Sequence, residues 1–467
     1  MKSRRDFLKV SAAATAAVAA RPLFAWQGAN NRVRMAVIGM GGRSGRVFDS
    51  LTRYDDVQFT MGCEVNQARA QGFQNGRPLA QPLTVVGDYR RVLDRNDIDA
   101  VLIGTPDFSH AKITADALAA GKHVYVEKPI SNSIPRINMM LDAYNKYPGL
   151  VVQVGTQQRS WDHFIEAKSK MPLLGNVTHV LIQHGGSYAQ NKQEVADVPA
   201  GLDWDAWQTD APKKPFKAGY TSFRAWWEYG SGLVGDWGAH HIDVANWFMN
   251  ADDKQPIKTS AVGFYANQNT DPECVFSVFS IAWQFDTYMM TFANEVFPRP
   301  NFEDPKAPDI EGWGVYFYGN SGTLQVNRMG WALRPPVSQT RNRVPPDPRP
   351  GTQAGGAAPA AGAAAPGAGG GRGGGRAGGA PGGGRGGGAA AVELNVYINP
   401  RGGVEEDYPL HAHTRDFLDK LKAKNRKTNA PMEVGYNSAL PALLALDAMK
   451  ENKILGWDPV AKKAKVL

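Results

Sequence analysis

Cysteine is scarce in this sequence: the 467 residues include only Cys63 and Cys274, far apart along the chain. Two cysteines cannot supply the disulfide framework of a small secreted scaffold, so the fold must rest on its hydrophobic core. No apolar run approaches the roughly 20 residues that a membrane-spanning helix needs. We therefore expect no membrane anchor, and the length of the chain predicts two domains.

Concentrated positive charge is missing from the body of the chain, although the formal net charge is +8. Residues 1–25 hold five cations and one acid, for +4, and residues 334–392 hold seven arginines and one acid, for +6. The rest of the chain therefore carries −2. A nucleic-acid groove needs a concentrated basic face, so we expect no nucleic-acid partner.

The N-terminus carries the segment Ser3-Arg4-Arg5-Asp6-Phe7-Leu8-Lys9, followed by an apolar run from Val10 to Ala20. This pattern resembles a twin-arginine export signal, and the run is too short to span a bilayer. We expect residues 1–27 to be a signal peptide and the protein to be exported, to the periplasm in a bacterium with two membranes.

The composition changes abruptly over residues 335–392, which are rich in proline at first and then almost purely Gly, Ala, Pro and Arg. A segment without large apolar side chains cannot bury enough surface to offset the entropy of ordering it. We interpret it as a disordered insertion within the second domain, because a strand and two helical stretches follow it and are too short to fold alone.

The remaining chain shows two different patterns. Within residues 28–155, short apolar runs at 33–38, 57–61, 100–103 and 123–126 alternate with amphipathic stretches, which predicts a doubly wound parallel Rossmann sheet. From residue 156 onward, strand-like runs follow one another at 177–183, 275–285, 288–295 and 314–318. Residues 156–467 are therefore predicted to form an α+β domain around a mostly antiparallel open sheet.

A dinucleotide fingerprint follows the first predicted strand. Residues 33–38 run into Gly39-Met40-Gly41-Gly42-Arg43-Ser44-Gly45, and a helical stretch follows. Gly39 permits a tight turn, and Gly41 lets the backbone approach a pyrophosphate at the helix N-terminus. Ser44 stands where a third glycine is usual, so either the loop is slightly reshaped or the Ser44 hydroxyl contacts phosphate.

The end of the second predicted strand carries Glu64, at the spacing expected of an acid that accepts hydrogen bonds from the ribose hydroxyls. A carboxylate there repels a 2′-phosphate, which favours NAD over NADP. Arg43 in the glycine loop leaves NADP as the less favoured alternative.

Two further clusters make the pattern specific. They are Gly104-Thr105-Pro106-Asp107-Phe108-Ser109-His110 with Val126-Glu127-Lys128-Pro129, and Gly235-Asp236-Trp237-Gly238-Ala239-His240-His241-Ile242-Asp243. Together with the glycine loop they resemble the glucose–fructose oxidoreductase and inositol dehydrogenase (Gfo/Idh/MocA) family. The resemblance covers residues 32–334 and resumes at 393–460.

The resemblance implies hydride transfer between a sugar or cyclitol carbinol and a nicotinamide. It places Lys128 near both, with Asp236 and His240 as the Asp-x-x-x-His pair and His240 as the acid/base. It also implies cofactor contacts from Gly42, Thr105, Pro106, His110 and Glu127, and substrate contacts from Gln157, Arg159 and Asp243.

Helical spacing supports His240 independently, because Asp236, His240 and Asp243 share one face of a helix while His241 points about 100° away. Asp and His also bind divalent ions, but no further ligand cluster has the spacing of a metal site, so we expect no metal. The tryptophans before this motif suit either sugar stacking or a core.

Three functions remain open. The favoured one is an oxidoreductase of a sugar or polyol that holds NAD tightly, because an exported enzyme has no pool of free cofactor. The alternatives are an NAD-dependent glycoside hydrolase that oxidises its substrate transiently, and a non-catalytic sugar-binding protein. The resemblance further implies a homo-oligomer, dimer or tetramer, assembled through the second domain.

Overall fold

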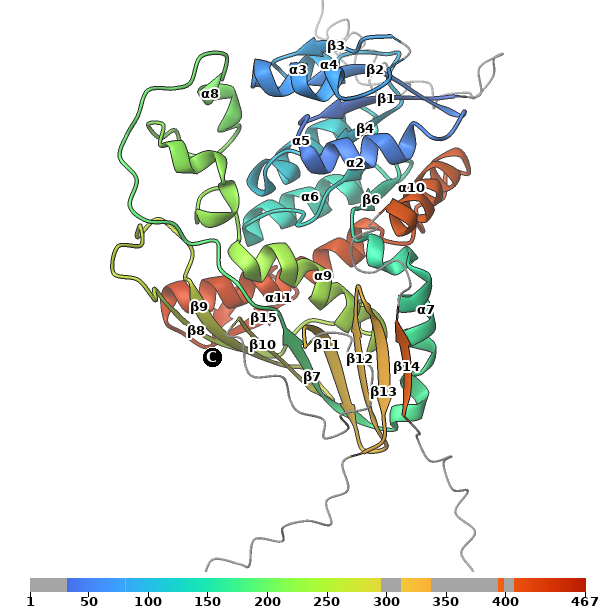
Figure 1. Ribbon diagram of the computed structural model, residues 1–467, viewed down its shortest axis with the longest axis vertical. Helices are drawn as coiled ribbons and strands as arrows, with labels where there is room; N and C mark the ends of the chain where they lie inside the picture. Colours follow the sequence, from blue (N-terminus) through green and yellow to red (C-terminus); the bar gives the residue numbers. More distant parts are fainter. Residues whose placement is uncertain (1–31, 80, 295–311, 337–393, 399–406) are drawn as a thin grey trace, which may run out of the picture.

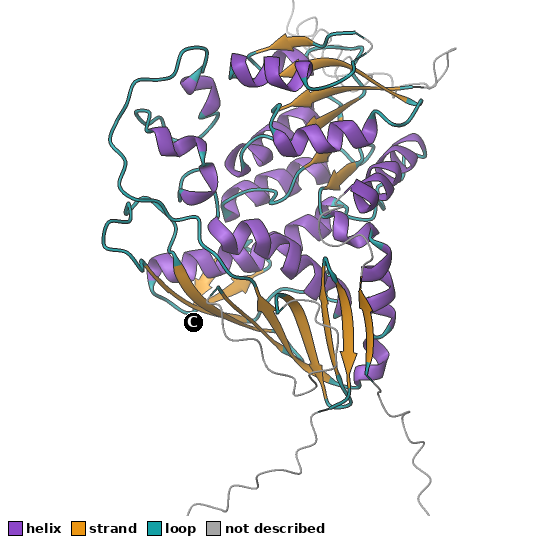
Figure 2. Cartoon of the chain, viewed as in Figure 1, coloured by secondary structure: helices purple, strands orange, loops and turns teal. Residues whose placement is uncertain are grey.

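The computed structural model describes residues 32–79, 81–294, 312–336, 394–398 and 407–467. The expected signal peptide and residues 337–392 of the expected insertion lie outside the described residues. In the described part, a six-stranded sheet and a ten-stranded sheet lie at opposite ends of the molecule, with helices between them (Figures 1 and 2).

The smaller sheet is parallel throughout, in the order β3-β2-β1-β4-β5-β6. Most of its central residues are buried, because helices cover both faces. The strand order reverses between β1 and β4, and ligands bind at such a point, outside the carboxyl ends of the strands. The predicted Rossmann sheet is confirmed. Its strands are β1 (Val33–Ile38), β2 (Val57–Cys63), β3 (Thr84–Val86), β4 (Ala100–Ile103), β5 (His123–Val126) and β6 (Val152–Val154).

The helices of this domain include one contributed by the C-terminal part of the chain. Leu410, Phe417 and Leu421 of α10 belong to the same apolar cluster as Val33 of β1 and Phe48 of α2. The C-terminal segment therefore completes the core of the first domain. The helices are α2 (Gly42–Leu51), α3 (Gln67–Asn75), α4 (Arg90–Leu93), α5 (Asp107–Ala119), α6 (Ile134–Lys146) and α10 (Asp407–Lys422).

The larger sheet has the order β14-β13-β12-β11-β7-β10-β9-β8-β15-β16. Its described pairs are antiparallel except β7 with β10, so the predicted, mostly antiparallel sheet is confirmed. In short strands with internal polar residues, such as β12, apolar and polar residues do not alternate clearly, so the sequence did not predict them. The strands are β7 (Val177–Gln183), β8 (Lys258–Phe264), β9 (Val278–Gln284), β10 (Met289–Ala293), β11 (Gly314–Gly319), β12 (Thr323–Asn327), β13 (Gly330–Arg334), β14 (Asn395–Ile398), β15 (Leu455–Asp458) and β16 (Lys463–Val466).

One apolar cluster joins the two domains. It contains Val101 and Ile137 of the first domain and Trp283 and Leu443 of the second. Helix α11 makes the connection, since it contacts α6, α9 and β8. The helices of the second domain are α7 (Asp162–Ser169), α8 (Trp204–Trp207), α9 (Gly232–Phe248) and α11 (Met432–Glu451), with a 3-10 turn, η1 (Gln157–Ser160), at its start.

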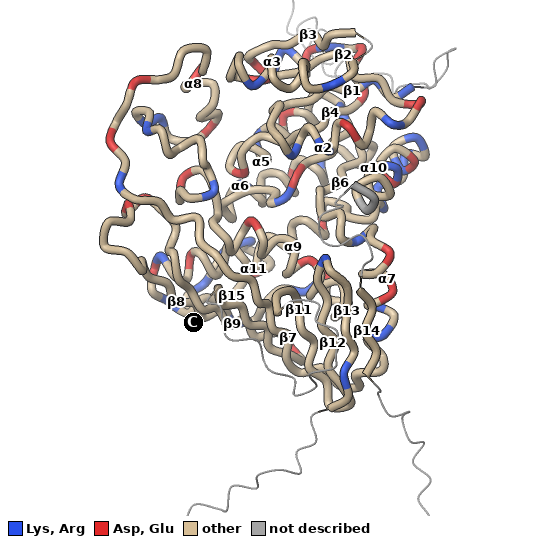
Figure 3. Tube along the Cα trace, in the orientation of Figure 1, with Lys and Arg blue, Asp and Glu red and all other residues tan. Residues whose placement is uncertain are grey.

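The charges of the described chain are mixed in sign. Lys and Arg alternate with Asp and Glu along the trace (Figure 3), and many form local pairs such as Arg95 with Asp97. Within the described ranges, no helix combines the length and apolarity needed to cross a bilayer. Both cysteines are buried free thiols.

Candidate active site

The glycine loop joins β1 to α2 at the topological switch point. Gly39 has a φ of +85°, and a Cβ there would lie 2.8 Å from Thr105 Cγ2, so this close approach requires glycine. A Cβ on Gly41 or Gly42 would meet no atom within 4 Å, because both glycines face an open cavity. Their backbone is accessible at the start of α2, as pyrophosphate binding requires. The loop therefore fits a dinucleotide.

Ser44 occupies the position where a third glycine is usual, on the first turn of α2. Its side chain is fully buried, and its hydroxyl donates to the Gly104 carbonyl at 3.0 Å. Ser44 is not among the residues that line the cavity. In this structure the hydroxyl joins α2 to the β4–α5 turn.

Glu64 lies at the end of β2 and lines the cavity. One carboxylate oxygen accepts from the Met40 amide at 2.9 Å, and the other accepts from the Asn66 amide at 3.0 Å. These two contacts hold the carboxylate beside the glycine loop, which is the position of the ribose-binding acid in a Rossmann domain.

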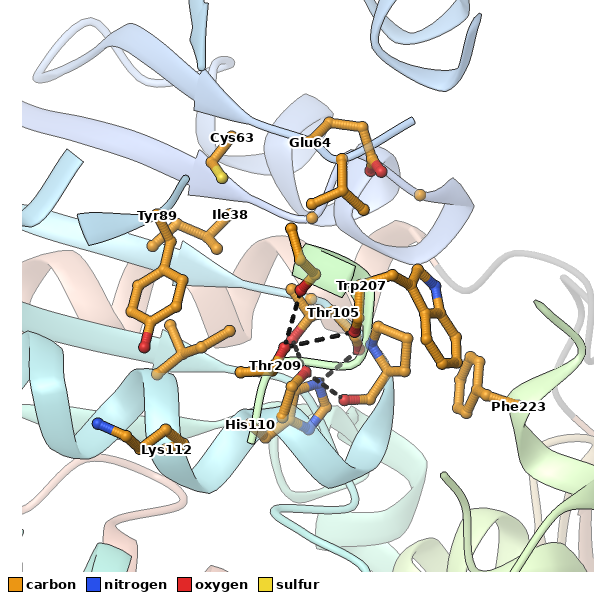
Figure 4. Close-up of a pocket in the computed structure, with 18 of the residues that line it drawn as sticks. Ile38, Cys63, Glu64, Tyr89, Thr105, His110, Lys112, Trp207, Thr209 and Phe223 are labelled. Carbon is orange, nitrogen blue, oxygen red and sulfur yellow. Dashed lines mark hydrogen bonds between the residues drawn. The ribbon is translucent and has the colours of Figure 1, made fainter. Parts of the chain in front are cut away.

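The cavity has a volume of about 860 Å³, within the range of cofactor sites. Ten of the eleven predicted cofactor residues line it, Ser44 being the exception. Figure 4 shows Glu64, Thr105 and His110 on the Rossmann side, with Trp207 and Phe223 contributed by the second domain. The ten residues are Gly39, Gly41, Gly42, Arg43, Glu64, Thr105, Pro106, His110, Glu127 and Lys128.

His110 links two turns that border the cavity. Its ring nitrogens lie 2.7 Å from the carbonyl oxygens of Thr105 and Pro129. Burial lowers the pKa of His110 to about 4, although both carbonyl contacts oppose that shift. The ring thus ties the β4–α5 turn to the turn that carries Lys128.

Arg43 bridges the glycine loop to the strand that ends at Glu127. Its Nε donates to Glu127 Oε1 at 2.9 Å, and its Nη2 donates to Gln157 Oε1 at 3.0 Å. The predicted substrate residue Gln157 therefore contacts Arg43 and does not line the cavity.

Lys128, which lines the cavity, forms an ion pair with Asp236. The Lys128 ammonium lies 2.7 Å from Asp236 Oδ1 and 3.2 Å from the Asp236 carbonyl oxygen. The Tyr188 hydroxyl donates to Asp236 Oδ2 at 2.6 Å, and Arg224 Nε lies 3.0 Å from Oδ1. Burial acts to raise the pKa of Asp236, but the charges of Lys128 and Arg224 outweigh it and lower that pKa. Asp236 is therefore an ionised anchor for Lys128.

His240 lies one helical turn beyond Asp236 on α9 and is buried. Burial, assisted by the charges of Lys128 and Arg328, lowers its pKa well below the usual range, so the ring is neutral. Arg328 Nη2 lies 3.3 Å from Nε2, and Nδ1 has no hydrogen-bond partner among the described residues. His240 is not among the residues that line the cavity.

Arg159 and Asp243 are not brought to the cavity. Arg159 Nε lies 2.9 Å from both Asp243 oxygens, its Nη1 donates to Asp252 at 2.9 Å, and Ser438 donates to Asp243 at 2.9 Å. Burial raises the pKa of Asp243 to about 6 against the opposing charge of Arg159. In this structure the two residues connect η1, α9 and α11.

Sequence reasoning missed Tyr188, Arg224 and the wall of the cavity between Asp203 and Lys213. They come from the segment between β7 and α9, which carries no recognisable motif. The tryptophans of this segment were the only feature of its sequence that pointed to a role, either in sugar stacking or in a core. Trp204 and Trp207 stack on each other at 4.7 Å and are largely buried, so they form a local core.

No group of three or more His, Cys, Asp or Glu in the described ranges is arranged to hold a metal ion. Asp236 is instead bound by Lys128, Arg224 and Tyr188, and Asp243 by Arg159 and Ser438. The cations that surround the carboxylates disfavour a divalent metal at either position.

Solved structures with the same fold include dehydrogenases with bound nucleotide. A levoglucosan dehydrogenase in complex with NADH and levoglucosan aligns with a TM-score of 0.58 and 15% identity, over 91% of this chain and 99% of that one. The WlbA dehydrogenase from Bordetella pertussis, in complex with NADH and UDP-GlcNAcA, aligns with a TM-score of 0.56 and 12% identity, over 91% and 98%. At these identities the likeness concerns the fold.

Curated relatives match the chain locally. An uncharacterized oxidoreductase, YrbE, of Bacillus subtilis strain 168 is 29% identical over 134 residues, 28% of this chain and 38% of that protein. A glycosyl hydrolase family 109 protein of Shewanella sp. strain W3-18-1 is 28% identical over 165 residues, 30% and 36% respectively. The chain spans little more than a third of the length of these relatives.

Two family matches cover both domains. Residues 33–156 match the oxidoreductase family with an NAD-binding Rossmann fold, and residues 184–297 match its C-terminal alpha/beta domain. The matched regions contain the glycine loop, Glu64, Lys128, Asp236 and His240. The chain belongs to the Gfo/Idh/MocA family of oxidoreductases.

Proposed function

We propose that the protein is an NAD-dependent oxidoreductase of a sugar or cyclitol carbinol, with NADP the less favoured cofactor. The observation that carries the proposal is that Lys128, paired with Asp236, lines the same cavity as the glycine loop and Glu64. A dinucleotide whose ribose meets Glu64 and whose pyrophosphate meets Gly41 extends toward Lys128. Lys128 then lies beside the reacting end of the cofactor.

The side chains around this end have distinct roles. When bound, the nicotinamide supplies the hydride acceptor. Lys128 stabilises negative charge on the substrate oxygen as its proton leaves. Asp236 accepts contacts from Lys128, Arg224 and Tyr188, so it orients Lys128 and is a poor proton acceptor. We take His240 as the proton acceptor from the family resemblance: its ring is neutral, although burial and the charges of Lys128 and Arg328 lower its pKa.

The expected export supports tight retention of the cofactor. Residues 1–31 lie outside the described ranges, so the signal remains a proposal from the sequence. An enzyme that works away from the cytoplasmic nicotinamide pool must regenerate its cofactor in place. A cycle in which the substrate is oxidised and a product reduced meets that need.

A second candidate is a glycoside hydrolase that oxidises a sugar ring transiently, eliminates the aglycone, adds water and reduces the ring again. The family 109 glycosyl hydrolases among the relatives favour it, although they match less than a third of this chain. The Lys128–Asp236 pair serves both reactions, because each begins with oxidation of a carbinol.

The test starts from protein purified without added nucleotide, whose nicotinamide content is measured first. The protein is then incubated with free sugars, cyclitols and nitrophenyl glycosides. Net reduction of added NAD by a free sugar supports the dehydrogenase, and glycoside cleavage without added NAD supports the hydrolase. Bound nucleotide with neither reaction across the panel would favour the sugar-binding protein.

The His240→Ala variant tests the proposed proton acceptor. We expect kcat to fall about 10²- to 10⁴-fold while nucleotide binding stays within about twofold, because only proton transfer is lost. His241→Ala is the matched control, since its imidazole lies 3.3 Å from that of His184 on another side of α9. Full activity in His240→Ala would move the base to another residue.

A further inference from the structure

The segment between β7 and α9, residues 185–231, is a folded arm of the second domain. It contains α8 and an aromatic cluster that includes Trp204, Phe216, Tyr220 and Trp226. Figure 1 shows this arm, in green, extending from the larger sheet to the side of the Rossmann domain that carries α3. Its own core makes it a defined structural unit.

The tip of the arm is hydrogen-bonded to the β2–α3 turn of the Rossmann domain. The Gln67 amide donates to the Gly201 carbonyl at 2.9 Å, and the Asp203 amide donates to the Val65 carbonyl at 2.9 Å. Asn66 and Leu202 form an antiparallel bridge between these contacts. The docking point directly follows Glu64, the acid assigned to the ribose.

A second set of contacts attaches the arm near the Thr105-Pro106 turn. The ring of Trp207 lies 5.4 Å from that of Phe108 on α5, and Arg136 of α6 lies 3.4 Å from Asp210. The arm therefore spans the opening between the end of β2 and the start of α5, which is where a Rossmann domain binds its nucleotide.

The arm also forms one wall of the cavity. Several of its residues line the same space as the glycine loop, and Figure 4 shows Trp207 and Phe223 among them. The arm residues in the lining are Asp203, Asp205, Ala206, Trp207, Thr209, Asp210, Lys213, Phe223 and Arg224.

We propose that the arm is part of the dinucleotide site, covering the adenosine half, and that its undocking from residues 65–67 controls nucleotide release. The inference rests on the dinucleotide site of the proposed function. Because the arm forms the wall of the cavity beside the docking point that follows Glu64, release of a bound nucleotide is coupled to breaking the hydrogen bonds at Val65 and Gln67. The same arm carries Tyr188 and Arg224 to Asp236, so closure over the cofactor and completion of the Lys128–Asp236 pair occur together.

The Gln67→Pro variant tests the docking point. Gln67 is the first residue of α3, where proline is well tolerated, and Asn66 has the extended backbone (φ −112°, ψ 110°) that a residue before proline prefers. Proline removes the amide that donates to Gly201 and leaves the helix intact. Gln67→Ala is the matched control, because it keeps this amide and shortens the same exposed side chain.

The measurement is the release rate of NADH from loaded protein chased with excess NAD, followed by energy transfer from tryptophan. We expect Gln67→Pro to release NADH roughly tenfold faster than wild type, because one interdomain hydrogen bond is lost. The release rate of Gln67→Ala should stay within about twofold of wild type. Equal release rates in Gln67→Pro and wild type would overturn the role of the arm.

Hydrogen exchange of the wild-type protein supplies a readout that needs no variant. NADH is expected to slow exchange of the Gln67 and Asp203 amides, and exchange that NADH leaves unchanged would contradict the proposal. Neither measurement involves sugar oxidation, so the proposed reaction can fail while the arm proposal stands. A wild-type protein that binds no NADH would overturn both.

Discussion

At the scale of single residues, Asp107 is a buried carboxyl group in the cavity wall. It begins α5, accepts a contact from the Ser231 hydroxyl at 3.4 Å and lies in the field of Arg224, Asp236 and Lys128. Burial raises its pKa to about 7, and the repulsion of Asp236 adds to this, while the two cations oppose it. The native state therefore holds a proton that the unfolded chain, with a pKa of 3.8, has lost.

This proton makes stability depend on pH. Between the unfolded and folded pKa values, the native state binds one proton more than the unfolded chain. The free energy of unfolding therefore falls by about 1.4 kcal/mol for each unit by which the pH rises. The Asp107→Asn variant replaces the carboxyl group by an amide of nearly the same shape, which does not titrate. We expect its stability relative to wild type to rise by roughly 2 kcal/mol from pH 5 to pH 7.5, measured by urea unfolding. Parallel curves for the two proteins would show that Asp107 is ionised throughout.

At the scale of elements, α10 is distant in sequence from the sheet that it covers. Phe417 is fully buried, and its ring lies 5.8 Å from that of Tyr125 in β5. His413 on the same helix bonds the Ser160 hydroxyl at 2.9 Å and the Val154 carbonyl oxygen at 2.9 Å. The helix thus fixes both the back of the Rossmann sheet and the start of the second domain.

Phe417→Ala should therefore weaken the nucleotide domain from a distance. Loss of a buried aromatic ring costs about 3–5 kcal/mol, measured as the free energy of unfolding in urea. Asp419→Ala removes a largely exposed partner of Arg415 on the same helix and should cost less than about 1 kcal/mol. A Phe417 variant as stable as the control would mean that α10 contributes little to the core.

At the scale of the whole molecule, the two domains share one apolar cluster through α6 and α11. The Tyr436 hydroxyl adds a hydrogen bond of 2.8 Å to Asn138 across this contact. Domains with separate cores unfold in separate steps, but domains that share a core lose it together. We expect one urea transition in the nucleotide-free protein, with coincident curves from circular dichroism and tryptophan fluorescence. Two separated transitions would show that each domain is stable alone.

Much of the fold could be predicted because its signals are local. The run Val33–Ile38 and the glycine loop lie within a dozen residues, and the predicted strand there matches β1 in both bounds. Lys128 and Asp236 carry motifs of their own, and the structure joins them at 2.7 Å. The substrate contacts of Arg159 and Asp243 were inferred from the family resemblance, which does not say whether a polar side chain faces a cavity or a buried partner.

The sequence by itself determined the strand–loop–helix that receives a dinucleotide and the motif residues Lys128, Asp236 and His240. Each depends on neighbours along the chain, where backbone geometry and spacing limit the outcome. Only the tertiary structure decided that residues 185–231 form one wall of the cavity, that Tyr188 and Arg224 hold Asp236, and that α10 completes the first domain. These contacts join segments far apart in sequence, and burial and charge pairing select them only when the whole chain has packed.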